Sequence, residues 1–151
     1  MKNSLLENID LNRIDIEKLI NKYEEEYDFT DKISMEQIKL VENNLGISFS
    51  SDYVWFLENY GSGGVLGIDV LGIARNNIAT VENITERLRK EFNLDNKMYI
   101  VEDCDEFFYC GKSGEDKIYY WDREEGIGKV EAGSFLEFLQ NRIIGAAENF
   151  E

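Results

Sequence analysis

The fold is decided by residues 52–73, which read DYVWFLENYGSGGVLGIDVLGI. Large apolar side chains recur at helical spacing, at positions 53, 56, 57 and 60, which predicts a short helix with one buried face. Gly61 follows where a helix end favours a left-handed residue. The apolar residues from Val65 to Ile73 then predict a buried strand or the start of a hairpin, bent at its glycines.

Helical periodicity and end signals predict further helices on both sides of this stretch. Ser34 with Gln37 forms a capping box before one of them, and Ser134 with Glu137 forms another before the last. The predicted helices span residues 15–27, 34–44, 51–60, 77–92 and 134–147. Short apolar runs bounded by turn residues predict strands at 98–102, 106–110, 117–121 and 127–130.

The order of these elements predicts an α+β fold. Strands joined by short turns must pair antiparallel, so we expect helices to cover a mostly antiparallel sheet. A length of 151 residues predicts one domain, residues 1–151, in which residues 1–14 form a loose N-terminal arm.

Charge limits the partners that the chain can bind. The formal net charge is -15, which argues against direct nucleic-acid binding and against anionic membrane surfaces. An acidic field attracts a basic partner, although acidity can also serve solubility alone. The N-terminal stretch lacks the pattern of a signal peptide, so we expect a cytoplasmic protein. In that compartment Cys104 and Cys110 are expected to be free thiols, and their spacing does not establish a disulfide.

The residues needed for the common catalytic centres are missing. The chain has no His, which removes serine and cysteine triads that depend on it, and two cysteines are too few for a zinc site. The glycines at 61, 63, 64 and 67 do not have the spacing of a phosphate-binding loop. The sequence therefore predicts no cofactor and no catalytic residue. A metal-dependent hydrolase that uses Asp69 and the acids of residues 102–106 is the weakest alternative.

The acidic run at residues 102–106 is the best candidate functional feature. It reads as a solvated turn, as an acidic patch that faces a basic partner, or as an oxygen-ligand site for Mg²⁺ or Ca²⁺. Asp122, Glu124 and Glu125 form a second acidic turn. In a strand meander the two turns can lie at one edge of the sheet. Trp55 lies off the apolar stripe of its helix and is expected at the surface, where Trp often anchors a partner.

The order of these motifs resembles the SUKH superfamily, the Smi1/Knr4-like proteins, and most closely its bacterial YobK-like branch. The resemblance covers most of residues 34–145. It rests on acid-Tyr-x-x-Phe-Leu-x-x-Tyr-Gly at 52–61, the glycine-rich turn and apolar segment at 63–73, an acid-ended strand at 99–105, an aromatic strand at 107–110, Trp-Asp at the end of 119–122, and Ser-Phe-x-x-Phe-Leu at 134–139. The family usually has Pro before the acid-Tyr helix, whereas this chain has Ser50 and Ser51 there and no Pro at all.

The resemblance implies a SUKH fold and a non-enzymatic immunity protein that neutralises a cognate bacterial toxin, often a nuclease. A nuclease carries a basic surface for its phosphate substrate, and an acidic inhibitor can occupy that surface. The eukaryotic branch implies the alternative of an intracellular regulatory scaffold. The partner-binding residues that we expect follow from charge and expected exposure, and they are Glu102, Asp103, Asp105, Glu106, Trp121, Asp122 and Trp55.

Overall fold

The computed structural model describes residues 12–149, and within them helices and strands follow the predicted α+β order. The helices are α2 (Arg13–Tyr23), α3 (Met35–Leu45), α4 (Ser51–Tyr60), α5 (Thr80–Phe92) and α6 (Phe135–Asn149). The strands are β1 (Met98–Asp103), β2 (Phe108–Lys112), β3 (Ile118–Asp122) and β4 (Gly126–Ala132). None of the helices in this part of the chain is long and apolar enough to cross a membrane.

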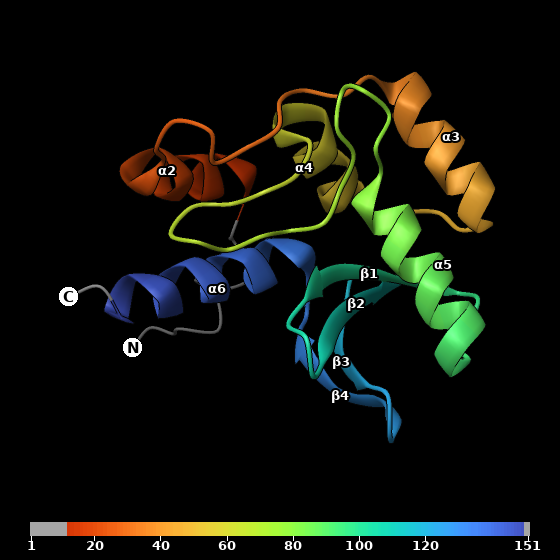
Figure 1. The fold of residues 1–151 in the computed structure, drawn as a ribbon. Helices are drawn as coiled ribbons and strands as arrows, with labels where there is room; N and C mark the ends of the chain where they lie inside the picture. Colours follow the sequence, from red (N-terminus) through yellow and green to blue (C-terminus); the bar gives the residue numbers. More distant parts are fainter. Residues whose placement is uncertain (1–11, 150–151) are drawn as a thin grey trace.

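The four strands form one antiparallel meander in the order β1-β2-β3-β4. Figure 1 shows α5 and α6 beside this sheet, with α2 and α4 on the far side of α6 and α3 next to α5. β1 is covered at its outer edge, because Leu71 N–H donates to the Val101 carbonyl and Ile100 N–H donates to the Thr85 hydroxyl. β4 is mostly exposed, and register shifts against β3 break its pairing in the way that protects natural edge strands.

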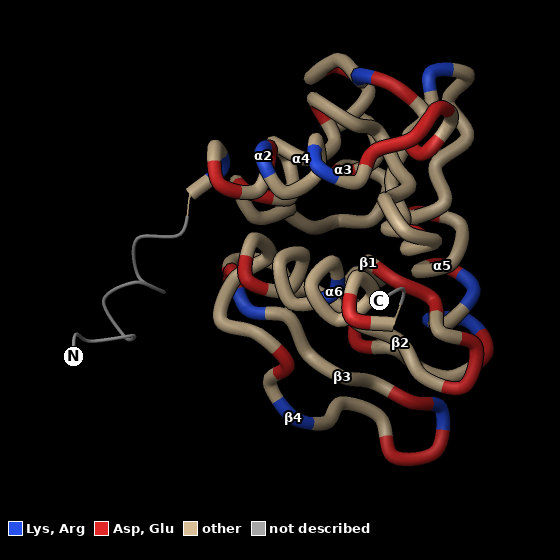
Figure 2. The backbone as a smooth tube through the Cα atoms, turned by 90° about the vertical axis from the view of Figure 1, so that its left-hand side faces the viewer, with Lys and Arg blue, Asp and Glu red and all other residues tan. Residues whose placement is uncertain are grey.

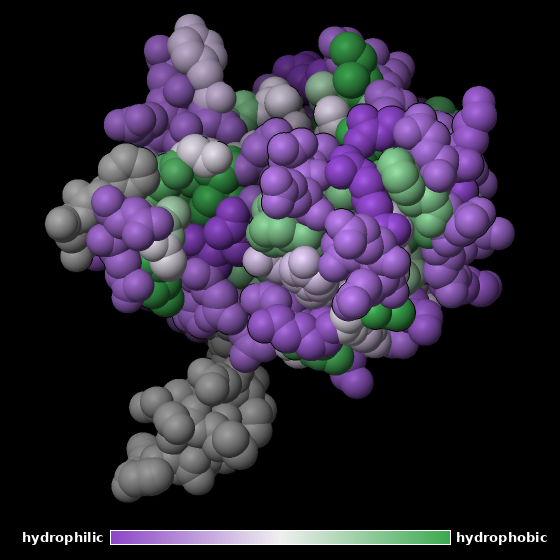
Figure 3. Space-filling view, turned by 60° about the horizontal axis from the view of Figure 1, so that its bottom comes forward, coloured by the Kyte–Doolittle hydropathy of each residue, from purple (hydrophilic) through white to green (hydrophobic). Residues whose placement is uncertain are grey.

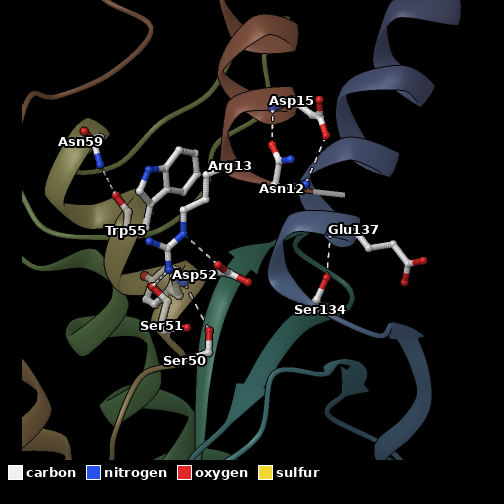
Figure 4. Close-up of polar contacts among 11 residues, drawn as sticks. Asn12, Arg13, Asp15, Ser50, Ser51, Asp52, Trp55, Asn59, Ser134 and Glu137 are labelled. Atoms are coloured by element: carbon white, nitrogen blue, oxygen red, sulfur yellow. Dashed lines mark hydrogen bonds and ion pairs between the residues drawn. The ribbon is translucent and has the colours of Figure 1, made fainter. Parts of the chain in front are cut away.

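Local capping explains where the helices begin. The Ser34 hydroxyl accepts the Gln37 N–H at 3.2 Å, which confirms the predicted capping box. The Ser50 hydroxyl accepts the Tyr53 N–H at 3.3 Å, so α4 starts at the expected place. At α6 the Ser134 hydroxyl accepts the Glu137 N–H at 3.1 Å (Figure 4).

Three helix boundaries differ from the prediction. α2 ends at Tyr23 and not at 27, where Tyr27 has a left-handed φ of 70° that a helix excludes. α2 begins at Arg13 with Asn12 as its cap, so residues 12–14, expected in a loose arm, form a helix start. The rest of that arm, residues 1–11, lies outside the described residues. α5 begins at Thr80 and not at 77, because Asn77 adopts a left-handed φ of 69° that a helix excludes.

The strand predicted at residues 65–73 is wrong. Only isolated bridges form in this segment, between Gly63 and Val70, between Val70 and Glu102, and between Ile73 and Ala79. Positive φ angles at Gly63, at Leu66 and at Gly67 curl the chain, and periodicity along a sequence does not reveal such angles.

Glycines in this segment allow main chain to pack on main chain. A Cβ atom on Gly72 would lie 1.9 Å from the Gly61 carbonyl oxygen. A Cβ atom on Gly61, where φ is 74°, would lie 2.3 Å from the Asp31 carbonyl oxygen. Three segments that are distant in the sequence therefore meet at distances that only glycine permits.

Aromatic side chains fill the centre of the core. Tyr53 stacks on Tyr99 with ring centroids 5.6 Å apart, and Phe49 and Phe135 meet Tyr53 edge-on at 5.0 and 5.2 Å. The Tyr53 hydroxyl donates to the Leu71 carbonyl at 2.6 Å, which ties the glycine-rich segment to α4. The Tyr99 hydroxyl accepts the Ser50 N–H at 3.3 Å, next to the start of the same helix.

The buried phenol of Tyr99 predicts a loss of stability at alkaline pH. Burial raises the pKa of Tyr99 from 10.0 to about 12. The unfolded chain releases this proton near pH 10 and the folded chain keeps it, so stability falls as pH rises from about 10 to 12. At about 1.4 kcal/mol for each tenfold change in proton affinity, Tyr99 contributes roughly 2–3 kcal/mol to this fall.

Urea denaturation at several pH values between about 8 and 12 measures this contribution. Tyr99→Phe keeps the ring and removes the titrating group. We expect the unmodified protein to lose roughly 2–3 kcal/mol more than Tyr99→Phe across the window, and equal losses below about pH 9. Parallel curves for the two proteins over the whole range would contradict the assignment.

Candidate functional site

Glu102 does not belong to the exposed acidic surface. Its side chain is buried, with the residue 5% exposed, and its two carboxylate oxygens accept from the Arg142 guanidinium of α6 at 2.8 and 2.6 Å. The Arg142 guanidinium also lies over the Tyr109 ring, 5.9 Å from the centroid. The hydrogen bonds to Glu102 raise the pKa of Arg142. The prediction that Glu102 faces a partner is therefore wrong, because the residue ties β1 to α6.

The two tryptophans expected as surface anchors are also buried. Trp55 is 7% exposed because Arg13 of α2 lies over its ring, 6.0 Å from the centroid, and Tyr60 packs against it edge-on. Figure 4 shows the Arg13 guanidinium between this ring and the Asp52 carboxylate, to which it donates at 3.0 Å. Trp121 is 3% exposed and packs edge-on against Phe108. Neither indole is accessible to a partner.

The other predicted acids lie in or near an open groove. The β1–β2 and β3–β4 turns lie at the same end of the sheet, an arrangement that the sequence allowed but did not establish, because β1 and β3 end on the same side of a meander. Both turns are marked by Asp and Glu at the lower right of Figure 2. Asp103 and Asp105 are exposed beside the groove. The groove itself is lined by Glu106, Phe107, Tyr120, Asp122, Arg123, Glu124 and Glu125.

The groove is shaped by hydrogen bonds within its own turns. One carboxylate oxygen of Asp122 accepts the N–H groups of Glu124 and Glu125 at 3.0 and 2.8 Å. The bond from the Glu125 N–H holds the pKa of Asp122 below its usual value. In the other turn the Asp103 carboxylate accepts the Asp105 N–H at 2.8 Å. The turns are thus fixed by main-chain contacts, which leaves the glutamate side chains free to point into solvent.

Aromatic rings form one wall of the groove. Phe107 and Tyr120 are half-buried and stacked, with ring centroids 5.3 Å apart and an interplanar angle of 19°. Partial burial raises the pKa of the Tyr120 phenol, and the Asp122, Glu125 and Glu106 carboxylates raise it further. These three carboxylates line the same groove as the Tyr120 ring. Side chains alternate between the two faces of β3, so Tyr120 and Trp121 point to opposite faces of the sheet. No pattern in the sequence identified Tyr120 as a site residue.

Arg123 is the cationic residue among those that line the groove, and it faces the other side of the sheet. Its guanidinium lies over the rings of Phe92 and Phe108, 5.2 and 5.4 Å from their centroids. Phe108 and Phe107 are adjacent in the chain and point to opposite faces. Arg123 thus fastens the β3–β4 turn to α5 and leaves the aromatic wall open.

The described residues contain no cluster of metal ligands and no activated thiol. Within residues 12–149 no three carboxylate or thiol side chains are grouped to hold a metal ion. Asp69, the weakest catalytic candidate, is exposed, and its pKa is raised by partial burial and by Asp103. Both cysteines are free, and burial raises the pKa of Cys104 to about 11 and that of Cys110 to about 12. Both thiols therefore stay protonated near neutral pH.

Figure 3 brings the strand end of the molecule forward. The surface on that side is largely hydrophilic, with small and separate hydrophobic areas. A contiguous apolar patch of the kind that marks many obligate interfaces is not seen on this face. Any partner that binds there must be recognised mainly through charge and through the few accessible rings.

The meander, the covering helices and the glycine-rich segment after an aromatic helix define a SUKH-type α+β domain. A family model described as SMI1-KNR4 cell-wall (SUKH_5) matches residues 16–144, and the chain belongs to this family. A crystal structure of a protein from Pseudomonas syringae pv. tomato has a similar fold, with a TM-score of 0.68 over 83% of this chain and 93% of that chain. The two sequences are 12% identical, so this likeness concerns the fold alone.

Proposed function

We propose that this chain is a non-enzymatic immunity protein that binds and neutralises a basic bacterial toxin domain, a nuclease, through the acidic groove. The observation that carries this proposal is the meeting of two acidic turns around an accessible aromatic pair. Family membership supports the class of protein, and the groove supports a basic partner.

Charge favours this partner over the other candidates. The net charge of -15 repels nucleic acid and a second copy of the chain, and it attracts a protein with a basic surface. A nuclease must keep such a surface for its substrate, so the inhibitor can cover the substrate site by using the same electrostatic attraction. Carboxylates at an exposed rim act mainly on the association rate, and salt weakens their effect.

Neutralising the free acids of the groove tests the proposal. The triple variant Glu106→Gln, Glu124→Gln, Glu125→Gln keeps Asp122, which holds its turn. We expect the dissociation constant to rise roughly 10- to 100-fold at about 50 mM NaCl, mostly through slower association, and to rise less at about 300 mM. Surface plasmon resonance measures both rates. The ligand is the basic C-terminal domain of any large toxin whose gene lies beside this one.

A matched control carries the same change of charge elsewhere. Glu24→Gln, Glu25→Gln, Glu26→Gln neutralises three exposed acids in the turn after α2 and is expected to change affinity less than about 3-fold. Equal effects of the two triple variants would place the interface outside the groove. Toxin domain that neither binds nor loses nuclease activity on addition of the unmodified protein would refute the immunity function.

A second candidate is a regulatory scaffold, which the family description SMI1-KNR4 cell-wall favours. A scaffold binds its partner and leaves the partner's activity unchanged, whereas an immunity protein abolishes it. The nuclease assay in the preceding experiment separates the two. A gene neighbourhood that contains no large toxin would also favour the scaffold.

A further inference from the structure

We infer that the groove is an arginine-binding site, which takes a guanidinium group of the partner against the wall formed by Phe107 and Tyr120. This inference rests on the proposed function, because it specifies which basic side chain the partner presents. It is based on an arrangement that the protein itself uses twice.

In each of those two places an arginine from another element lies over an aromatic ring and pairs with a carboxylate. Arg142 lies over Tyr109, 5.9 Å from the centroid, and binds both oxygens of Glu102. Arg13 lies over Trp55, 6.0 Å from the centroid, and donates to Asp52 at 3.0 Å. In both places, a guanidinium group from a distant segment packs on an aromatic ring and binds the carboxylate beside it.

The groove contains the same partners without the arginine. Tyr120 is paired with Tyr109 across β2 and β3, so it lies next to the ring that Arg142 covers. Glu106, Asp122 and Glu125 line the same groove as Tyr120. Within the described residues the side chains of Glu106, Glu124 and Glu125 form no ion pair. Since Arg123 faces Phe92 and Phe108, no arginine of residues 12–149 covers this wall.

The geometry suits arginine better than lysine. A guanidinium group is flat and stacks on an aromatic face while its N–H groups donate to carboxylates in its own plane. It also gives up water more easily than the compact ammonium group of lysine. The Phe107 and Tyr120 rings are stacked and nearly parallel, and they line a hollow of about 570 Å³ that is open to solvent. Glu106, Glu124 and Glu125 line the same groove and are exposed, so their carboxylates are available to accept N–H groups.

Short peptides test this chemistry without the toxin. The probes are acetyl-Gly-Arg-Gly-amide, the matching lysine peptide and the matching citrulline peptide, which is neutral and shaped like arginine. We expect the arginine peptide to shift the amide signals of Phe107 and Tyr120 in NMR titrations and to bind at least about 5-fold more tightly than the lysine peptide. Citrulline should cause no comparable shift. Equal binding of arginine and lysine, or shifts spread evenly over all acidic turns, would overturn the inference.

Matched variants place the effect in the groove. Tyr120→Leu should reduce binding of the arginine peptide at least about 5-fold and bring it to the level of the lysine peptide. Tyr27→Leu removes a 90% exposed tyrosine from another acidic turn, one without an aromatic stack, and should leave binding unchanged. Urea denaturation confirms that both variants are folded. If Tyr120→Leu is folded and still prefers arginine, the inference is wrong.

The outcomes separate this inference from the function on which it rests. Toxin binding that depends on Glu106, Glu124 and Glu125, together with no preference for arginine, would leave the immunity function standing and refute the arginine site. A clear preference for arginine with no binding of the toxin domain would support the site and refute the immunity function.

Discussion

Gly72→Ala is expected to leave the chain unfolded or to lower the free energy of unfolding by more than about 4 kcal/mol. The added Cβ would lie 1.9 Å from the Gly61 carbonyl oxygen, and that carbonyl is held in place because it accepts the Ile73 N–H at 3.0 Å. Gly61 in turn donates to the Leu57 carbonyl of α4. Relieving this steric clash would break main-chain hydrogen bonds in the middle of the core, because the atom that the Cβ meets belongs to the main chain and not to a flexible side chain.

Two other glycines act as controls for the substitution itself. Gly145 lies in α6 with no atom near the added Cβ, so Gly145→Ala should stabilise the protein by about 0.5–1 kcal/mol. Gly67 is equally open but has a φ of 83°, so Gly67→Ala should cost about 1–2 kcal/mol. Circular dichroism and urea denaturation measure the series. A folded Gly72→Ala protein within about 1 kcal/mol of the parent would show that the main-chain contact is not rigid.

Arg142→Met is expected to destabilise the protein by about 2–4 kcal/mol, because it leaves the Glu102 carboxylate buried without a partner. The Arg142 side chain is 33% exposed, so water can still reach the carboxylate in part and the cost falls short of that for a fully buried pair. Urea denaturation near neutral pH measures the change.

The double variant distinguishes a lost partner from lost packing. Glu102→Met, Arg142→Met removes both charges and should regain most of the stability that Arg142→Met loses. Arg75→Met breaks the exposed pair between Arg75 and Asp31, which is 3.0 Å long, and should cost less than about 1 kcal/mol. If Arg142→Met lowered the free energy of unfolding no more than Arg75→Met does, the ion pair with Arg142 would not be needed to keep Glu102 buried.

The parts of the fold that the sequence predicted are those controlled by neighbouring residues. The capping box of Ser34 and Gln37 spans three residues, and it formed as expected. The meander followed from short turns between apolar runs. The prediction for residues 65–73 failed because the course of this segment depends on positive φ angles and on contacts with β1, such as the hydrogen bond from the Leu71 N–H to the Val101 carbonyl. No local pattern in the sequence contains these features.

The candidate site was predicted in part for the same reason. The alternating direction of the strands allowed the two acidic turns to lie at the same end of the sheet, and the structure shows that they line one groove. Glu102 was misplaced because its partner, Arg142, lies 40 residues further along the chain. Trp55 was misplaced because Arg13, which covers it, lies in a segment expected to be a loose arm. A linear pattern gives the charge of a residue, but its exposure depends on which distant side chain reaches it.

The hydrogen bonding of the β3–β4 turn separates two tasks that many binding surfaces combine. Asp122 holds the main chain in shape, whereas Glu124 and Glu125 contribute their N–H groups to that shape and keep their side chains outside the core. Substituting Glu124 or Glu125 changes the side chains that line the groove and leaves the hydrogen bonds of the turn intact. The charge that this turn presents and the shape of its main chain can therefore change independently of each other.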